Sequence, residues 1–185
     1  FIGEDICIRA HFHPAPANKL YDIIITPKMS FGTGHHETTS MMLQHMSEMD
    51  LTNKVVFDFG CGTAILSIYA SLRGSKNVVA IDNDTWSVEN GLENCAQNKC
   101  QNITVSDQAI ETIPSTFDLI VANINLNILV EHMPILKKCL QRGGDLLLSG
   151  ILVEDENTMR DCLQNFDLQV VSTKKAGNWL SIHAK

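Results

Sequence analysis

A glycine turn between an apolar strand pattern and a helical pattern is the part of this chain best suited to hold a ligand. The run Asp58-Phe59-Gly60-Cys61-Gly62 follows the apolar residues VVF and precedes the helical pattern AILSIYASL. Glycines at such a turn let a ligand approach the backbone closely, and the following helix presents unpaired N–H groups. Gly60 and Gly62 therefore predict a binding site, with Cys61 between them and the Asp58 carboxylate nearby.

The spacing around this turn argues against two common nucleotide sites. The dinucleotide fingerprint G-x-G-x-x-G has its third small residue at a position that Ile65 occupies here, and no G-K-[ST] follows to form a phosphate-binding loop. The Asp58 carboxylate, two residues before the first glycine, would repel a pyrophosphate and suits a cationic ligand. A nicotinamide-dependent dehydrogenase is the alternative that these features disfavour.

Acidic residues follow the next two strand patterns. The stretch VVAIDND places Asp82 and Asn83 roughly 20 residues beyond the glycine turn, where a carboxylate can accept both hydroxyls of a ribose. Asp84 is the better candidate to cap the next helix, which leaves Asp82 free for the ribose. The stretch ITVSDQA contains Asp107, either a further ligand contact or an exposed loop residue.

The order of strand and helix patterns supplies a scaffold for these positions. Strand-like residues open the chain, a helical pattern follows GTGHHE, and apolar strand patterns then alternate with helical ones. This alternation predicts an α/β fold with a mostly parallel, seven-stranded sheet. The last two strands predict an antiparallel hairpin that turns near KAGN. The predicted strands cover 54–59, 77–81, 102–106, 117–122, 145–149, 167–174 and 178–184, and the helices between them cover 64–73, 84–97, 126–141 and 153–165.

Composition limits the class of protein. The 185 residues suit one domain with a substantial core. The formal net charge of −7 disfavours direct nucleic-acid binding, which needs clustered Lys and Arg, and suits a basic protein partner. No apolar run approaches the roughly 20 residues of a membrane span, and the start lacks the pattern of a signal peptide. We therefore expect a cytoplasmic protein that acts away from membranes.

Cysteine and histidine spacing predicts no metal site. The six cysteines form no C-x-x-C pair, so we interpret them as reduced thiols, most of them in the core. His11 and His13 could face one side of a strand, but two solvent-facing histidines are the favoured interpretation. Met42, Leu43 and Met46 form an apolar helical stripe that predicts core packing.

Four segments resemble known protein families. The glycine turn is similar to the D-x-G-x-G-x-G loop of S-adenosylmethionine (AdoMet) methyltransferases, with Ala64 in place of the third glycine. The segments FGTGHHETT over 31–39, VANI over 121–124 and GGDLLLSGIL over 143–152 resemble motifs of the ribosomal protein L11 methyltransferase family. Glu37 stands where that family usually has proline. The resemblance extends from about Tyr21 to the end of the chain.

This resemblance implies a Rossmann-like fold, S-adenosyl-L-methionine as cofactor, and methylation of lysine and N-terminal amino groups on a ribosomal protein of the large-subunit stalk base. It implies that Asn123 orients the incoming amine and that Asp107 faces the adenine. His36 matches a family histidine, interpreted as ordering its loop. The cofactor-binding residues expected from the motifs are Phe31, Gly32, Thr33, Gly34, Thr38, Thr39, Asp58, Gly60, Cys61, Gly62, Asp82, Asn83, Asp107 and Asn123.

The resemblance also suggests a division of the chain. Residues 1–26 would be a strand-like lead-in from an N-terminal recognition domain outside this sequence, and residues 27–185 the AdoMet-binding catalytic domain. Two alternatives keep the fold but change the function. One is a methyltransferase acting on another protein or a small molecule, and the other is a non-catalytic AdoMet-binding module.

Overall fold

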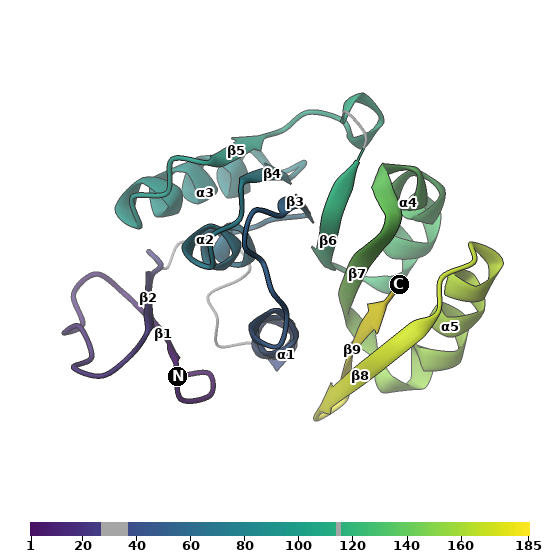
Figure 1. Cartoon of the computed structure of the whole chain (residues 1–185), viewed down its shortest axis with the longest axis horizontal. Coiled ribbons are helices and arrows are strands. Elements are labelled where there is room, and N and C mark those ends of the chain that lie inside the picture. The colour runs from purple at the N-terminus through teal and green to yellow at the C-terminus, as the bar shows by residue number, and fades with distance from the viewer. Residues whose placement is uncertain (27–36, 114–115) are drawn as a thin grey trace.

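The computed structural model describes residues 1–26, 37–113 and 116–185. A seven-stranded sheet runs in the order β5-β4-β3-β6-β7-β9-β8, and β1 and β2 form a separate parallel pair (Figure 1). The strands are β1 (Ile6–Arg9), β2 (Tyr21–Ile24), β3 (Val55–Phe59), β4 (Asn77–Ile81), β5 (Ile103–Ser106), β6 (Phe117–Asn123), β7 (Leu140–Leu152), β8 (Val170–Ala176) and β9 (Trp179–Ala184). The helices are α1 (Glu37–Ser47), α2 (Ile65–Leu72), α3 (Thr85–Gln97), α4 (Leu126–Cys139) and α5 (Glu156–Asn165).

The pairing of these strands confirms the predicted mostly parallel sheet. Strand β3 lies parallel to β4 on one side and to β6 on the other, and β7 continues the parallel order beyond β6. Strand β9 is antiparallel to both β7 and β8. The hairpin turns between Ala176 and Trp179, within the predicted KAGN segment.

Helices cover both faces of the sheet, because its central strands carry apolar side chains on both (Figure 1). Val56 and Val121 share a core cluster with residues of α1, α2 and α3. Phe57 and Ile120, their chain neighbours, share the second cluster with residues of α4 and α5. Neighbouring residues of one strand point to opposite faces, so this alternation produces the three layers.

Strand β7 differs most from its predicted boundaries. It covers Leu140–Leu152, whereas the sequence pattern predicts only 145–149, and α4 ends at Cys139 instead of 141. Leu140 already has an extended backbone and pairs with Phe117. The ladder then shifts register, around Gly143 with its φ of +76°. Glycine is a weak strand former, so the pattern places a boundary where the strand contains an irregularity.

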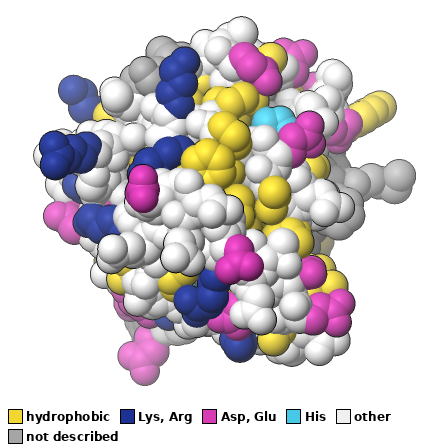
Figure 2. All heavy atoms as spheres, turned by 90° about the vertical axis from the view of Figure 1, so that its right-hand side faces the viewer, with side chains coloured by type: hydrophobic (Ala, Val, Ile, Leu, Met, Phe, Trp, Pro, Cys, Tyr) yellow, Lys and Arg dark blue, Asp and Glu magenta, His cyan; other side chains and the backbone are white. Residues whose placement is uncertain are grey.

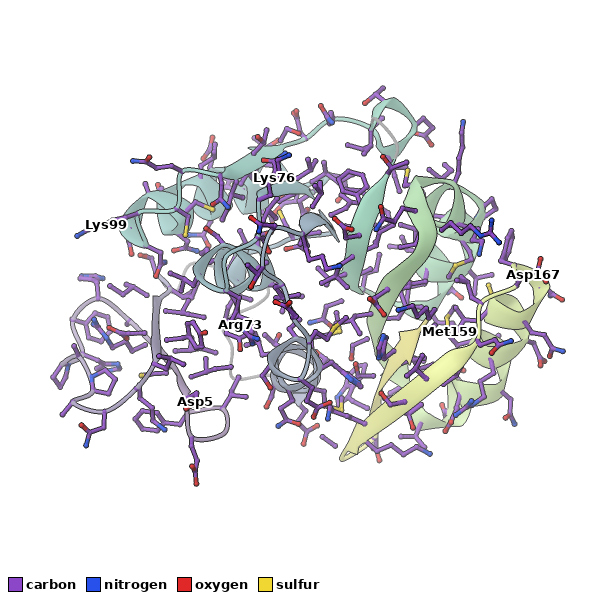
Figure 3. All side chains as sticks on the ribbon, in the orientation of Figure 1. Asp5, Arg73, Lys76, Lys99, Met159 and Asp167 are labelled. Carbon is purple, nitrogen blue, oxygen red and sulfur yellow. The ribbon has the colours of Figure 1, made fainter. Side chains whose placement is uncertain are left out.

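The first 26 residues pack against the rest of the protein. Ile6 and Ile23 are buried in the core cluster of α1 and α2. Arg73, at the end of α2, donates hydrogen bonds to the Met49 carbonyl (2.8 Å) and the Tyr69 hydroxyl (2.9 Å). Its guanidinium also lies 5.8 Å from the ring centroid of Tyr21. Figure 3 shows Arg73 between α2 and α1, where it connects both helices to β2.

The histidines, the α1 stripe and the cysteines are placed as follows. His11 and His13 are exposed, as favoured, and the three residues of the α1 stripe are buried. All six cysteines are unpaired, and five of them are buried. Within the described ranges no group of His, Cys, Asp and Glu side chains could hold a metal ion. The helices of those ranges are too short or too polar to cross a membrane.

Candidate functional site

The strand order reverses between β3 and β6, which makes their carboxyl ends the candidate ligand site. From β3 the chain passes outward to β4 and β5, and from β6 it passes the other way to β7. Ligands of open α/β sheets bind in the crevice at such a switch point. Gly60 follows β3, Asp82 follows β4, Asp107 follows β5 and Asn123 ends β6. The structure therefore places these four predicted residues along one edge of the sheet.

The glycine turn is held against the end of β4 by backbone hydrogen bonds. The N–H groups of Gly60 and Cys61 both donate to the Ile81 carbonyl, at 2.9 and 3.0 Å. The N–H of Gly62 donates to Oδ2 of Asp82 at 2.8 Å. Gly60 and Gly62 have φ values of +76° and +53°, a region that glycine adopts readily. The turn is therefore fixed in shape by its neighbouring strand.

Asp82 does not cap α3, but its carboxylate accepts hydrogen bonds from the surrounding backbone. Besides Gly62, the N–H of Asp84 donates to its other oxygen, Oδ1, at 3.0 Å. The prediction for Asp84 is confirmed, since its side chain caps α3 by accepting from the N–H of Ser87 at 3.1 Å. A carboxylate has about four lone-pair positions. Two backbone donors therefore still leave Asp82 with capacity to bind hydroxyl groups.

Asp58 lies beneath the turn, with only 1% of its surface exposed. Its Oδ2 accepts a hydrogen bond of 2.6 Å from the hydroxyl of Ser67 on α2. Burial raises the pKa of the Asp58 carboxyl to about 7, the nearby negative charge of Asp82 adds to that rise, and the Ser67 hydrogen bond opposes it. The Asp58 oxygens therefore have almost no exposed surface through which to contact a ligand directly.

Asn123 and Thr39 meet across the site. The Nδ2 group of Asn123 donates to Oγ1 of Thr39, in the first turn of α1, at 3.2 Å. Thr39 is buried, and so is Thr38 beside it. With Nδ2 directed at Thr39, the Oδ1 atom is the part of the Asn123 amide suited to accept a hydrogen bond from a substrate. The structure thus brings together two predicted residues that are 84 positions apart.

Ile124 fits between two glycines and fixes the loop after β6. A Cβ atom on Gly60 would lie 2.5 Å from Cγ2 of Ile124, and one on Gly150 would lie 2.5 Å from the Ile124 carbonyl oxygen. The Ile124 N–H also donates to the Ser149 carbonyl at 3.1 Å. The glycine turn, the loop that carries Asn123 and strand β7 therefore pack closely enough to exclude a methyl group between them.

Comparison with known proteins agrees with this arrangement. The family model described as "Ribosomal protein L11 methyltransferase (PrmA)" matches residues 1–185. The chain belongs to this family. Curated proteins named ribosomal protein L11 methyltransferase are 40% identical over 183 residues in Phocaeicola vulgatus and 43% identical over 182 residues in Porphyromonas gingivalis. These matches cover 98% and 97% of the chain, but the chain spans only 65% and 63% of those relatives.

A solved structure extends the likeness to three dimensions. The crystal structure of a ribosomal protein L11 methylase from Lactobacillus delbrueckii subsp. bulgaricus superposes with a TM-score of 0.84 at 27% identity. The superposition covers 95% of this chain and 90% of that one. Family membership and this likeness confirm the Rossmann-like methyltransferase fold expected from the motifs.

The departure from the loop pattern at Ala64 is accommodated. Ala64 has a left-handed backbone (φ +60°, ψ +22°) at the start of α2, where glycine would carry no strain. Its methyl group faces Gly91 of α3, on which a Cβ would lie 3.4 Å from the Ala64 Cβ and 3.3 Å from Val105. The turn therefore keeps its shape, with the added methyl group packed against a glycine of the next helix.

The other predicted residues of the family motifs differ in how exposed they are and in whether the structure describes them. Cys61 is buried within the turn, and Asn83 and Asp107 are exposed at the edge of the site. Four residues of the upstream motif lie outside the described residues, together with His36: Phe31, Gly32, Thr33 and Gly34.

Sequence reasoning missed the supporting residues Ser67 and Gly150. Ser67 follows the turn on a helix, with nothing local to show that it reaches Asp58. Gly150 stands within the family stretch SGIL, and a glycine inside a strand pattern is a signal for a close backbone approach. That signal could have indicated a close neighbour, although not that the neighbour is Ile124.

Proposed function

We propose that this chain is the catalytic part of an AdoMet-dependent N-methyltransferase that modifies amino groups of ribosomal protein L11. The observation that carries the proposal is the pairing of two features at one sheet edge. One is the glycine turn bonded through the N–H of Gly62 to the Asp82 carboxylate, and the other is the Asn123–Thr39 pair. The first suits a nucleoside with a cationic group, and the second suits an amine that must be oriented.

The residues of the site fit AdoMet as a cofactor. Asp82 retains lone pairs for the two ribose hydroxyls, and Asp107 lies at the end of the neighbouring strand, where an adenine amino group is expected. The glycine turn exposes its backbone to the ligand, and Thr38 and Thr39 are buried, so they would support the methionine end indirectly, Thr39 through its hydrogen bond with Asn123. Asp58 beneath the turn, with its pKa raised to about 7, is partly ionised at neutral pH, and this partial negative charge favours a cation.

The chemistry asks little of protein acids or bases. AdoMet, when bound, supplies a methyl group that is already activated by its sulfonium. A lysine with an ordinary pKa of about 10.4 is protonated at neutral pH, and a site that excludes water favours its neutral, reactive form. Asn123 Oδ1 can accept one N–H of that amine and so point the nitrogen lone pair at the methyl group. Alignment of this kind supplies most of the rate.

The surface supports a protein substrate more than a nucleic acid. On the face formed by α4, α5 and β8, Figure 2 shows Lys and Arg interspersed with Asp and Glu around a band of apolar side chains. The formal net charge is −7. An acidic protein attracts a basic ribosomal protein and repels RNA phosphates. We propose the stalk base as the location of that substrate, the cytoplasm as the place of action, and residues 27–185 as the catalytic unit.

Calorimetric titration with S-adenosylhomocysteine, with NAD as the control, tests the cofactor. Binding of the first and not the second is the expected result. Binding of NAD alone would establish the dehydrogenase alternative, and binding of neither would refute the cofactor assignment. Mass spectrometry of ribosomal protein L11 after incubation with the chain and AdoMet then tests the substrate. Absence of added methyl groups, despite cofactor binding, would favour another substrate or a non-catalytic AdoMet-binding module.

A further inference from the structure

Helix α3 holds the first part of the chain through asparagine side chains. Oδ1 of Asn98 accepts from the N–H of Ile24 at 2.9 Å, and its Nδ2 donates to the Ile24 carbonyl at 2.7 Å. The Asn98 amide thus pairs with the backbone of Ile24 as a residue of a neighbouring strand would. One side chain therefore satisfies both the N–H and the carbonyl of Ile24.

Asn94, one helical turn earlier, bonds to two separate segments. Its Oδ1 accepts from the N–H of Thr26 at 3.0 Å, and its Nδ2 donates to the Thr63 carbonyl at 3.0 Å. Thr63 belongs to the glycine turn, between Gly62 and Ala64. Asn94 and Thr63 are both fully buried. One amide therefore connects the end of the lead-in to the loop expected to hold the cofactor.

The two ends of the glycine turn have different hydrogen-bond partners. At its first end, the N–H groups of Gly60 to Gly62 donate to the Ile81 carbonyl and the Asp82 carboxylate at the end of β4. At its second end, the Thr63 carbonyl accepts from Asn94. A buried carbonyl that loses its donor is costly, so the Thr63–Ala64 peptide would rotate to find another. That rotation would break the hydrogen bond from the Ala64 N–H, on the same peptide group, to the Cys61 carbonyl at 2.8 Å, which closes the turn.

We propose that Asn94 is a positioning residue for the cofactor, which holds the glycine turn in its binding shape and couples it to the lead-in at Thr26. This inference rests on the proposed function, because it takes the turn to be the AdoMet site. It assigns to the lead-in a part in cofactor binding. Asn94 itself touches neither the cofactor nor the substrate in this proposal, so its effect should appear in affinity through the turn.

Titration of S-adenosylhomocysteine into two alanine variants provides the test. Asn94→Ala removes one bond to the lead-in and the bond to the turn. Asn98→Ala removes two bonds to the lead-in and one to the Asn94 carbonyl, and none to the turn. Asn94→Ala should weaken affinity about tenfold, equivalent to about 1.4 kcal/mol. Asn98→Ala should leave affinity unchanged. Asn94→Asp, which keeps the acceptor for Thr26 but loses the donor to Thr63, should also weaken affinity.

Amide hydrogen exchange of the wild-type chain gives a second test that needs no variant. S-adenosylhomocysteine should slow exchange of the Thr26 N–H, which is bonded to Asn94, and leave the Ile24 N–H unchanged. Folded Asn94 variants with wild-type affinity would overturn the inference, as would an equal loss in Asn98→Ala or an unaffected Thr26 amide. Failure of the wild type to bind S-adenosylhomocysteine would instead refute the proposed function, so the two failures are distinguishable.

Discussion

Relative to wild type, the Asp58→Asn variant should gain stability as pH rises from acidic to neutral. The Asp58 carboxyl is almost fully buried, and that burial raises its pKa from 3.8 to about 7. The folded protein therefore holds this proton more tightly than the unfolded chain does. The stability that Asp58 contributes is complete below pH 3.8 and is lost as pH rises towards 7.

The size of this loss follows from the two pKa values. A tenfold difference in proton affinity corresponds to about 1.4 kcal/mol, so a rise from 3.8 to about 7 corresponds to about 4 kcal/mol of unfolding free energy. The asparagine of the variant would be neutral at every pH. An Nδ2 group that lacks an acceptor would cost about 1–3 kcal/mol, but that cost is constant across pH. The slope of the difference between the two proteins is therefore the informative quantity.

The variant must be compared with wild type because His45 gives the unfolding free energy a pH dependence of the opposite sign. Burial lowers the pKa of His45 from 6.5 to about 4, so its contribution to stability is lost as pH falls through that range. The wild-type curve alone therefore combines two opposing slopes. Since both proteins contain His45, its contribution cancels when Asp58→Asn is compared with wild type at each pH.

Urea unfolding of both proteins from pH 4.5 to pH 8 would measure the effect. The difference should change by about 3 kcal/mol in favour of the variant across this range, because at pH 4.5 the unfolded chain is already mostly ionised at this residue. Asp161→Asn, at an exposed position of α5, gives the background from removing a carboxylate without altering a buried site. Parallel curves for wild type and Asp58→Asn would refute the reasoning, because they would mean that the folded protein tolerates the Asp58 charge without penalty.

Three further outcomes are expected at the site. Asp82→Ala should weaken S-adenosylhomocysteine binding at least about tenfold in calorimetry, since ribose and turn both lose a charged acceptor, and unchanged affinity would remove Asp82 from the site. Asn123→Ala should lower kcat for methylation of ribosomal protein L11 with little change in cofactor affinity, and the reverse pattern would make Asn123 a cofactor ligand only. Gly60→Ala should destabilise the fold by about 2 kcal/mol, part of which Ile124→Ala should restore in urea unfolding. Gly150→Ala should show no such rescue, because its added methyl group would meet the Ile124 backbone.

The steric conflict at Gly60 corrects a simpler expectation from the sequence. With only the turn in view, Gly60→Val is expected to block the cofactor while leaving the fold intact. In the structure, a Cβ at this position would lie 2.5 Å from Cγ2 of Ile124, and φ is +76°. A larger residue would therefore disturb the loop that carries Asn123 as well. Loss of binding in that variant could not be assigned to the cofactor alone.

The sequence predicts the sheet well because its signals are local. Apolar runs such as those of β3 and β4 end at a glycine or an aspartate, and hydrophobic periodicity changes to the helical period directly afterwards. The cap at Asp84 is local too, since it depends on residues within one turn. The hydrogen bonds that join Asn94 with the Thr26 N–H and the Thr63 carbonyl are not local, so no pattern in the sequence indicates them.

Asp58 carries a sequence signal that supports two different interpretations. Its place two residues before Gly60 suggests a carboxylate that faces the ligand. A central parallel strand is buried on both faces, however, and Asp58 lies within such a strand, next to Phe57. Its position in the strand therefore predicts burial and a raised pKa. An effect on the cationic ligand proposed above would then come through the electric field beneath the turn.

These features indicate where the activity of the site is most vulnerable. The turn, the loop after β6 and strand β7 are connected by backbone hydrogen bonds and by contacts that only glycine permits at Gly60 and Gly150. Methyl transfer to a neutral amine needs alignment more than a protein acid or base. Substitutions that move this backbone should therefore impair turnover more than removal of any exposed titratable group around the site, Asp107 included. Rate measurements on Gly150→Ala and Asp107→Asn would compare the two kinds of change directly, and a larger loss in Asp107→Asn would show that charge, not alignment, limits the reaction.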